Sequence, residues 1–115
     1  MAVVSWGKGA RYKFIAAGEL LNFTAPQLAV VYAITYKQDP SSRPKSHTVL
    51  YFGHTDDFSV DMPSVHTDIE NIWLESGGSM KELYIFVHPM PGTTRQERRD
   101  LQEKLVLEYS PKGNN

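Results

Sequence analysis

Two short apolar runs dominate the hydrophobic and polar pattern of the chain. Residues 29–36 (AVVYAITY) are rich in Val, Ile and Tyr, as β-strands are. Both alternating faces of this run are largely apolar, which predicts a strand covered on both sides. Residues 48–52 (TVLYF) predict a second strand. Two prolines and two consecutive serines lie between the runs, so we expect an antiparallel pair joined by a loop rather than a tight turn.

Helical periodicity follows the second run. Val65, Ile69, Ile72 and Trp73 recur at the spacing of an amphipathic helix. Two glycines, at positions 77 and 78, are typical of a helix end. Asp61, which lies two residues before Pro63, is a plausible N-cap for this helix.

A third strand and a second helix are predicted near the C-terminus. Residues 82–88 (ELYIFVH) have strand character and end at a proline. Thr94 and Glu97 have the spacing of a capping box, with a hydroxyl at the N-cap and a carboxylate three residues later. The sequence therefore predicts a helix from this point to about residue 108.

The N-terminal residues have a weaker pattern. Residues 12–21 (YKFIAAGELL) fit either a short strand or a short helix, because Gly18 weakens both assignments. A chain of 115 residues suits one domain. We expect residues 1–28 to pack on a domain formed by residues 29–115. The predicted fold is α/β, of the α+β type, with a small three-stranded antiparallel sheet flanked by helices.

Composition narrows the classes of function. The net charge is −1, from 12 basic and 13 acidic residues, which argues mildly against a dedicated nucleic-acid binder. Basic residues nevertheless cluster at 8–13, 37–45 and 95–99, so local basic patches are compatible with the sequence. The absence of cysteine excludes disulfides, thiolate nucleophiles and thiolate zinc sites. No apolar run approaches the ~20 residues of a membrane span, and no signal peptide is recognisable, so we expect a cytoplasmic protein without a membrane partner.

Candidate chemistry is sparse. The four histidines (His47, His54, His66 and His88) are dispersed, and no pair has the spacing of a helical metal site, so no metal site is predicted. His54 and His66 flank an acidic segment that either binds a cation or is a solvated helix start. Gln102 shares a helical stripe with Leu105 and Tyr109. Its amide must find hydrogen bonds, face a cleft or lie at the exposed margin of the stripe.

Several of these residues, taken in order, resemble the motifs of the GIY-YIG nuclease superfamily. Tyr32, within VVYAI, corresponds to the tyrosine that ends the first half-motif. Tyr51 and Gly53, within LYFG, match the second half-motif. The polar stretch HTDDF follows, and Pro111 and Asn114 match the Pro-x-x-Asn signature near the family's C-terminus. The resemblance covers residues 29–114.

The resemblance implies a mixed sheet of three antiparallel strands flanked by helices, and metal-dependent hydrolysis of DNA phosphodiesters. In that family the first tyrosine is a proposed general base, an arginine stabilises the phosphate, and a glutamate holds one divalent metal. Here the arginine position is taken by Asp61 and the glutamate position by Gln102. An aspartate repels a phosphate, and a neutral amide is a poor ligand for Mg²⁺.

Three functional interpretations follow. The first is a catalytically degenerate domain that has no cofactor and binds nucleic acid, such as DNA, or a protein partner over the former cleft. The residues of this cleft would be Tyr32, Tyr51, Gly53, His54, Asp61, His66, Gln102 and Asn114. The second is a divergent endonuclease that uses Mg²⁺ or Mn²⁺, with an arginine from residues 95–99 as the cation and Glu103 or an acid near Asp56 as the metal ligand. The third is an interaction domain whose motif match is accidental.

Overall fold

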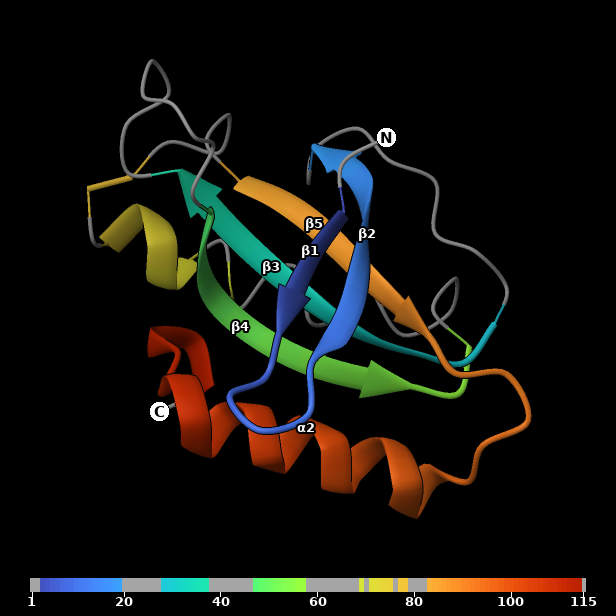
Figure 1. Ribbon diagram of the computed structural model, residues 1–115. Coiled ribbons are helices and arrows are strands. Elements are labelled where there is room, and N and C mark those ends of the chain that lie inside the picture. The colour runs from blue at the N-terminus through green and yellow to red at the C-terminus, as the bar shows by residue number, and fades with distance from the viewer. Residues whose placement is uncertain are drawn as a thin grey trace.

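The protein is an α+β domain built on a five-stranded antiparallel sheet (Figure 1). The computed structural model describes residues 3–19, 28–37, 47–57, 69, 71–75, 77–78 and 83–114. Its strands are β1 (Val3–Trp6), β2 (Tyr12–Glu19), β3 (Val30–Lys37), β4 (His47–Thr55) and β5 (Leu83–Pro89). Helix α2 (Arg95–Tyr109) and the 3-10 turn η2 (Lys112–Asn114) follow, and residues 69 and 71–75 form a shorter helix before β5.

The expectation of a three-stranded sheet is wrong, because the N-terminal segment supplies two further strands. The sheet order is β1-β2-β5-β3-β4, so β2 pairs with β5 and extends the sheet beyond the three predicted strands. The ambiguous residues 12–21 contain strand β2, whose register against β5 shifts between Ala16 and Gly18. Such a bulge breaks the alternation of a strand without ending it, which explains the mixed signal in the sequence.

Strand β3, the first strand of the predicted pair, lies between two neighbours in the sheet. It pairs antiparallel with β4 on one side and with β5 on the other. Its residues from Val30 to Thr35 are buried, which confirms that both faces of this strand are covered. In the β3–β4 pair the register shifts between Ile34 and Thr35, so β4 has one extra residue there.

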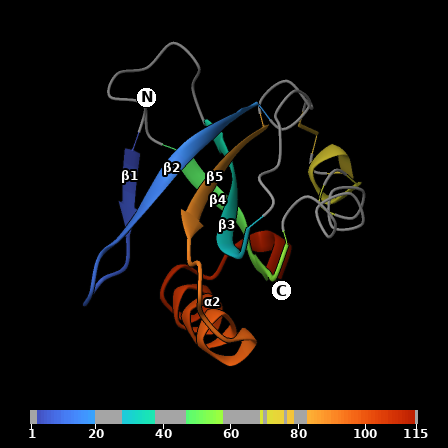
Figure 2. The ribbon, with the colours of Figure 1, turned by 90° about the vertical axis from the view of Figure 1, so that its right-hand side faces the viewer.

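Each face of the sheet has its own apolar core and its own helix (Figure 2). On the first face, Tyr32, Ile34 and Leu50 pack with Ile69 of the shorter helix. Ile72 and Trp73 extend this contact, which confirms their place on the apolar stripe of that helix. The part of the stripe at Val65 lies outside the described residues. On the second face, Leu101 and Leu105 of α2 pack on a group of core residues that consists of Trp6, Phe14, Val31, Ala33, Phe52 and Phe86.

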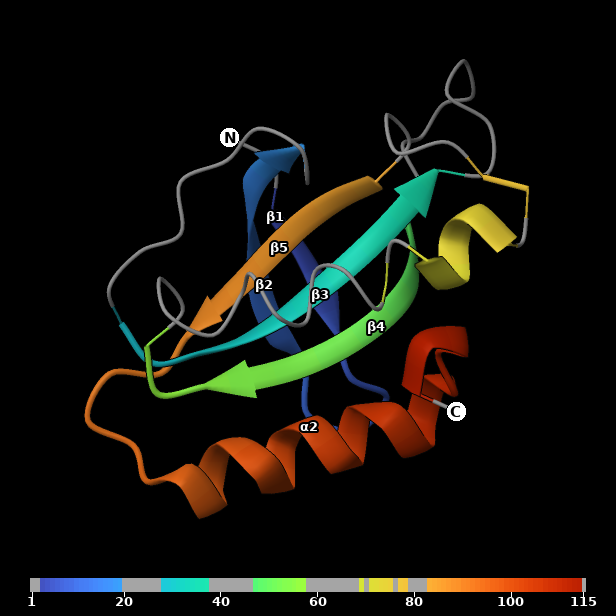
Figure 3. The ribbon, with the colours of Figure 1, turned by 180° about the vertical axis from the view of Figure 1, so that it is seen from behind.

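Helix α2 begins and ends as the sequence predicts. Thr94 is the N-cap, and the reciprocal bonds of a capping box join it to Glu97. The C-cap is Ser110, which has a left-handed backbone conformation (φ 47°). The helix runs antiparallel to β4 and close beside it (Figure 3), so residues along the helix face successive positions of this edge strand.

The two ends of the described chain are joined on the second face. The backbone N–H of Gly7 donates to the Tyr109 hydroxyl (2.8 Å), and that of Lys8 donates to Glu108 Oε2 (3.0 Å). Trp6 is buried in the same core. Among the described helices, none has the length and apolar character required to cross a bilayer.

Candidate functional site

The two motif tyrosines lie next to each other on the first face of the sheet. Their ring centroids are 6.0 Å apart, as expected for tyrosines on one face of paired strands. Tyr32 is 2% exposed and belongs to the core, whereas Tyr51 is half-buried at its edge. The role of general base that the resemblance gives to Tyr32 stays a prediction.

Gly53 allows the Tyr32 ring to lie against the backbone of β4. The two residues are direct partners in the β3–β4 register. A Cβ atom at position 53 would collide with the ring and the hydroxyl of Tyr32. Glycine is therefore required here by the close approach of the Tyr32 ring to the strand backbone.

Gln102 and Asn114 converge on the backbone of Phe52. Asn114 Oδ1 accepts a hydrogen bond from the Phe52 N–H (2.8 Å), and its Nδ2 donates to the Phe52 oxygen (2.9 Å). Gln102 Nε2 donates to the same oxygen (2.9 Å). Because β4 is the last strand of the sheet, Asn114 takes the place of a neighbouring strand at this residue. Both amides thus complete the edge of the sheet.

This arrangement accounts for an amide at position 102. Gln102 is half-buried, and its hydrogen bond requires an N–H donor that an ionised glutamate does not have. The same side chain borders a cleft of about 470 Å³ that is also lined by Arg99, Glu103, Val106, Leu107 and Asn114. Gln102 therefore both makes a hydrogen bond and faces a cleft.

The predicted cleft residues are only partly brought together. Asp61 and His66 lie outside the described residues. Tyr32 and Tyr51 belong to the first face, whereas Gln102 extends from α2, which covers the second face. His54 lies two residues beyond Phe52, at the end of β4. The strand backbone at Phe52 and Gly53 thus links the two groups.

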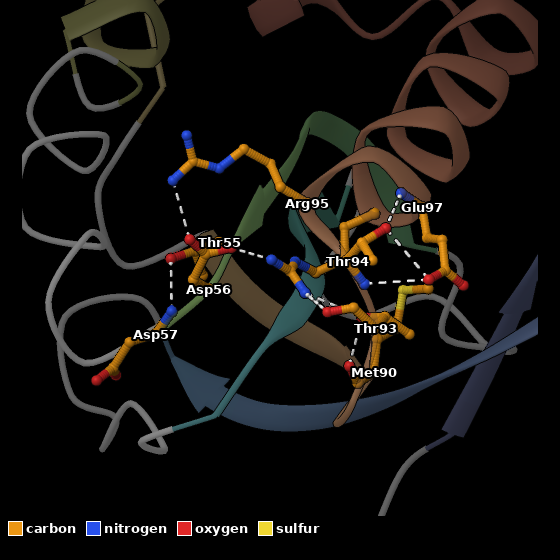
Figure 4. A network of polar contacts seen from close by, with 9 residues as sticks. Thr55, Asp56, Asp57, Met90, Thr93, Thr94, Arg95 and Glu97 are labelled. Carbon is orange, nitrogen blue, oxygen red and sulfur yellow. Dashed lines mark hydrogen bonds and ion pairs between the residues drawn. The ribbon is translucent and has the colours of Figure 1, made fainter.

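A polar network fixes the end of β4 to the start of α2 (Figure 4). Asp56 accepts hydrogen bonds from Arg95 Nη2 (2.9 Å) and from Arg98. The Arg98 side chain is only 4% exposed, and it also donates to the backbone oxygen (2.7 Å) and the hydroxyl (2.9 Å) of Thr93. Arg98 is therefore held from both sides, and its charge is used to bind Asp56.

The other two arginines of this cluster face solvent beside the network. A pocket of about 300 Å³ is lined by His54, Thr55, Asp56, Arg95 and Arg99. The Arg95 side chain is 76% exposed, and Arg99 is also exposed. Arg99 Nε pairs with Glu103 (3.1 Å), one turn further along α2. The pocket lies beside the N-terminal end of a 15-residue helix, whose dipole favours an anion there.

The sequence contains the arginine cluster but gives only an indirect indication of the pocket. The contacts of Asp56 with Arg95 and Arg98 span 39 and 42 residues, so they depend on the placement of α2 beside β4. The signal was an acid directly after a strand and three arginines in the first turns of a later helix. Within the described ranges, no group of three or more His, Asp or Glu residues is placed to hold a metal ion.

Comparisons with known proteins give one partial similarity. No protein-family model and no solved structure matches the chain. Ribonuclease R of Thermotoga maritima is 27% identical over 100 residues, which cover 84% of this chain. The chain corresponds to 14% of the length of that protein. The resemblance to GIY-YIG nucleases therefore stays a prediction.

Proposed function

We propose that this domain binds nucleic acid without cleaving it, through the surface formed by the end of β4 and the first half of α2. The observation that carries the proposal is the pocket of about 300 Å³ in which Arg95 and Arg99 lie beside His54 and Thr55. Guanidinium groups bind phosphate oxygens through planar, charge-assisted hydrogen bonds. A phosphate group therefore suits this pocket.

The two exposed arginines can exchange their present partners for a phosphate. Arg95 and Asp56 form an exposed ion pair, with side chains 76% and 52% exposed. Exposed pairs of this kind stabilise a fold by only about 0–1 kcal/mol, so breaking one costs little. Asp56 keeps a second partner in the buried Arg98, so its charge remains matched when Arg95 turns to a ligand.

The shape of the surface favours an extended ligand. Arg99 lines both the arginine pocket and the cleft beside Gln102 and Asn114, so the two hollows adjoin. The similarity to a protein named as a ribonuclease supports nucleic acid over a protein partner. The ligand of this proposal is thus a nucleic-acid strand that follows α2.

The absence of cleavage is part of the proposal. The position that the resemblance gives to the metal-binding glutamate is Gln102, whose amide donates to the Phe52 oxygen. The position that it gives to the phosphate-binding arginine is Asp61. A divergent endonuclease needs another carboxylate and another cation in these roles.

Binding is tested by fluorescence anisotropy with short labelled RNA and DNA strands over a range of salt concentrations. The variant with Arg95→Gln and Arg99→Gln should bind at least ~10-fold more weakly, and its log–log salt slope should fall by about 1.5 to 2. Arg11→Gln, at an exposed arginine in the loop between β1 and β2, the two strands farthest from β4 in the sheet order, is the matched control for loss of charge. Equal weakening in the control, or no binding by the unmodified protein at low salt, contradicts the proposal.

Cleavage is tested separately by incubating supercoiled plasmid with the protein and Mg²⁺ or Mn²⁺. We expect the plasmid to stay intact. Nicking that disappears in the Tyr32→Phe variant would establish the divergent endonuclease instead.

A further inference from the structure

An aromatic pocket lies at the opposite end of α2 from the arginines. It has a volume of about 270 Å³, and its lining includes Tyr36, Thr48, Leu50, Trp73, Tyr109 and Ser110. It combines the ends of the β3–β4 pair, the short helix and the last turn of α2. Nothing in the GIY-YIG resemblance accounts for these aromatic residues.

Three rings surround this pocket. Tyr36 and Trp73 have ring centroids 4.4 Å apart and an interplanar angle of 33°, so the two rings are in contact and tilted against each other. Tyr109 contributes the third ring from α2. All three side chains are half-buried, unlike the buried rings of Trp6, Phe14, Phe52 and Phe86 on the second face. Half-buried rings that line a pocket offer surface on which a planar ligand can stack.

The polar groups of the pocket are neutral. Thr48 and Ser110 add hydroxyl groups to its lining. Among the described residues that line it, none carries a charge. The Tyr109 hydroxyl already accepts a hydrogen bond from the Gly7 N–H. The pocket therefore suits a neutral planar ring with polar edges rather than a phosphate or a free ion.

We propose that this pocket binds a single unpaired nucleobase, so that the domain takes single-stranded nucleic acid along α2. The inference rests on the proposed function and names its substrate class. A volume of about 270 Å³ is near the lower limit of small-molecule pockets, so it accommodates one base rather than a base pair. A base inside a duplex is stacked on its neighbours on both faces, so it cannot enter this pocket.

The distance between the two pockets suits a strand of several nucleotides. Helix α2 has 15 residues, which span about 20 Å at 1.5 Å per residue. Its first turns carry the arginines, and its last residue is Tyr109. Proteins that bind single strands combine a basic track for the phosphates with aromatic side chains for the bases. The two ends of α2 supply these two parts.

The pocket is tested first with ligands that have no phosphate. Adenosine and uridine are titrated at millimolar concentration into the isotopically labelled protein, and amide signals are followed by NMR. We expect shifts at Thr48, Val49 and Ser110 and at the indole N–H of Trp73, with the amide of Arg99 unchanged. No shift at these positions overturns the base pocket, even if the arginine variants still weaken oligonucleotide binding.

A second test removes the stacking surface. Tyr36→Leu keeps an apolar side chain but no ring, and it should weaken binding of a single-stranded oligonucleotide ~10-fold or more. Tyr36→Phe keeps the ring and should bind as the unmodified protein does. Val3→Ala, at a side chain 53% exposed on β1, the strand at the opposite edge of the sheet from β4, is the control for lost apolar surface. Unchanged binding by Tyr36→Leu contradicts the proposal.

The outcomes separate the two proposals. If nucleosides shift the pocket signals but the arginine variants bind oligonucleotides normally, the base pocket is supported and the phosphate-binding surface is refuted. Stronger binding to duplex than to single strands refutes the base pocket and leaves a nucleic-acid-binding function. Melting temperatures show which variants remain folded, and the nucleoside titration decides the matter if Tyr36→Leu does not fold.

Discussion

The middle and the end of strand β4 use polar side chains in opposite ways. At Phe52, in the middle, both backbone groups are bound by Asn114, and Gln102 adds a second donor to the oxygen. Beyond Thr55, at the end, the exposed side chains of Arg95 and Arg99 pair with carboxylates that are also exposed, those of Asp56 and Glu103. Polar side chains that bind backbone groups stabilise the fold. Polar side chains whose N–H donors stay accessible to solvent can bind a ligand. Substitutions in the middle should therefore change stability, and substitutions at the end should change binding.

The largest effect on stability is expected for Gly53→Ala. The added methyl group meets the ring of Tyr32, which is 2% exposed and packed in the core of the first face. Overpacking of this kind costs about 1–3 kcal/mol, and we expect the upper end of that range. Chemical denaturation measures the change. Gly9→Ala is the matched control, because a Cβ atom at Gly9 meets nothing within 4 Å and the free energy of unfolding should change little.

Asn114→Ala should lower the free energy of unfolding by about 2 kcal/mol. It removes two hydrogen bonds to Phe52, each of which contributes about 0.5–1.5 kcal/mol, and it leaves the edge of β4 open. Asn71→Ala, on the exposed side of the short helix, is the control. Equal destabilisation by both changes would show that Asn114 is not needed to complete the strand edge.

Gln102→Glu should destabilise the domain by about 1 kcal/mol. The variant replaces an amide donor by a carboxylate that faces the Phe52 oxygen, so one hydrogen bond is lost. It also installs the residue type that the GIY-YIG resemblance implies at this position. We expect no gain of plasmid nicking with Mg²⁺ or Mn²⁺. A metal-dependent nicking activity in this variant would place position 102 at a metal site.

The smallest effect on stability is expected for Arg95→Gln, at the start of α2 beside the end of β4. Its ion pair with Asp56 is exposed, so the free energy of unfolding should change by less than about 0.5 kcal/mol. The salt slope of oligonucleotide binding should nevertheless fall by about 1, because one phosphate contact is lost. A loss of stability comparable with that of Asn114→Ala would remove the distinction between the two parts of the strand.

The elements with a clear periodic pattern could be predicted from the sequence. Strands β3, β4 and β5 have apolar runs, and α2 has a capping box at Thr94 and Glu97. Strand β2 was ambiguous because Gly18 and the adjacent bulge interrupt its alternation. The position of β5 between β2 and β3 depends on pairing between distant segments, which local pattern does not specify.

In the candidate site, too, local pattern predicts some contacts and not others. The proximity of Tyr32 and Tyr51 follows from the alternation of two adjacent strands, and it is observed. The contact of Asn114 with Phe52 joins residues 62 positions apart, and that of Arg98 with Asp56 joins residues 42 apart. Neither contact leaves a periodic signal. The burial of Arg98 is equally hidden, because an arginine in the first turns of a helix usually faces solvent.

The bonds from Gly7 and Lys8 to the last turn of α2 affect the order in which the domain can form during translation. They join residues that are 102 and 100 positions apart, and β2 must also wait for β5 before it gains a second neighbour. A ribosome adds about 5–20 residues per second, so the N-terminal strands emerge well before their partners are made. The five-stranded sheet can therefore be completed only after β5 has been made. The bonds of Gly7 and Lys8 form later still, when α2 has left the exit tunnel of the ribosome.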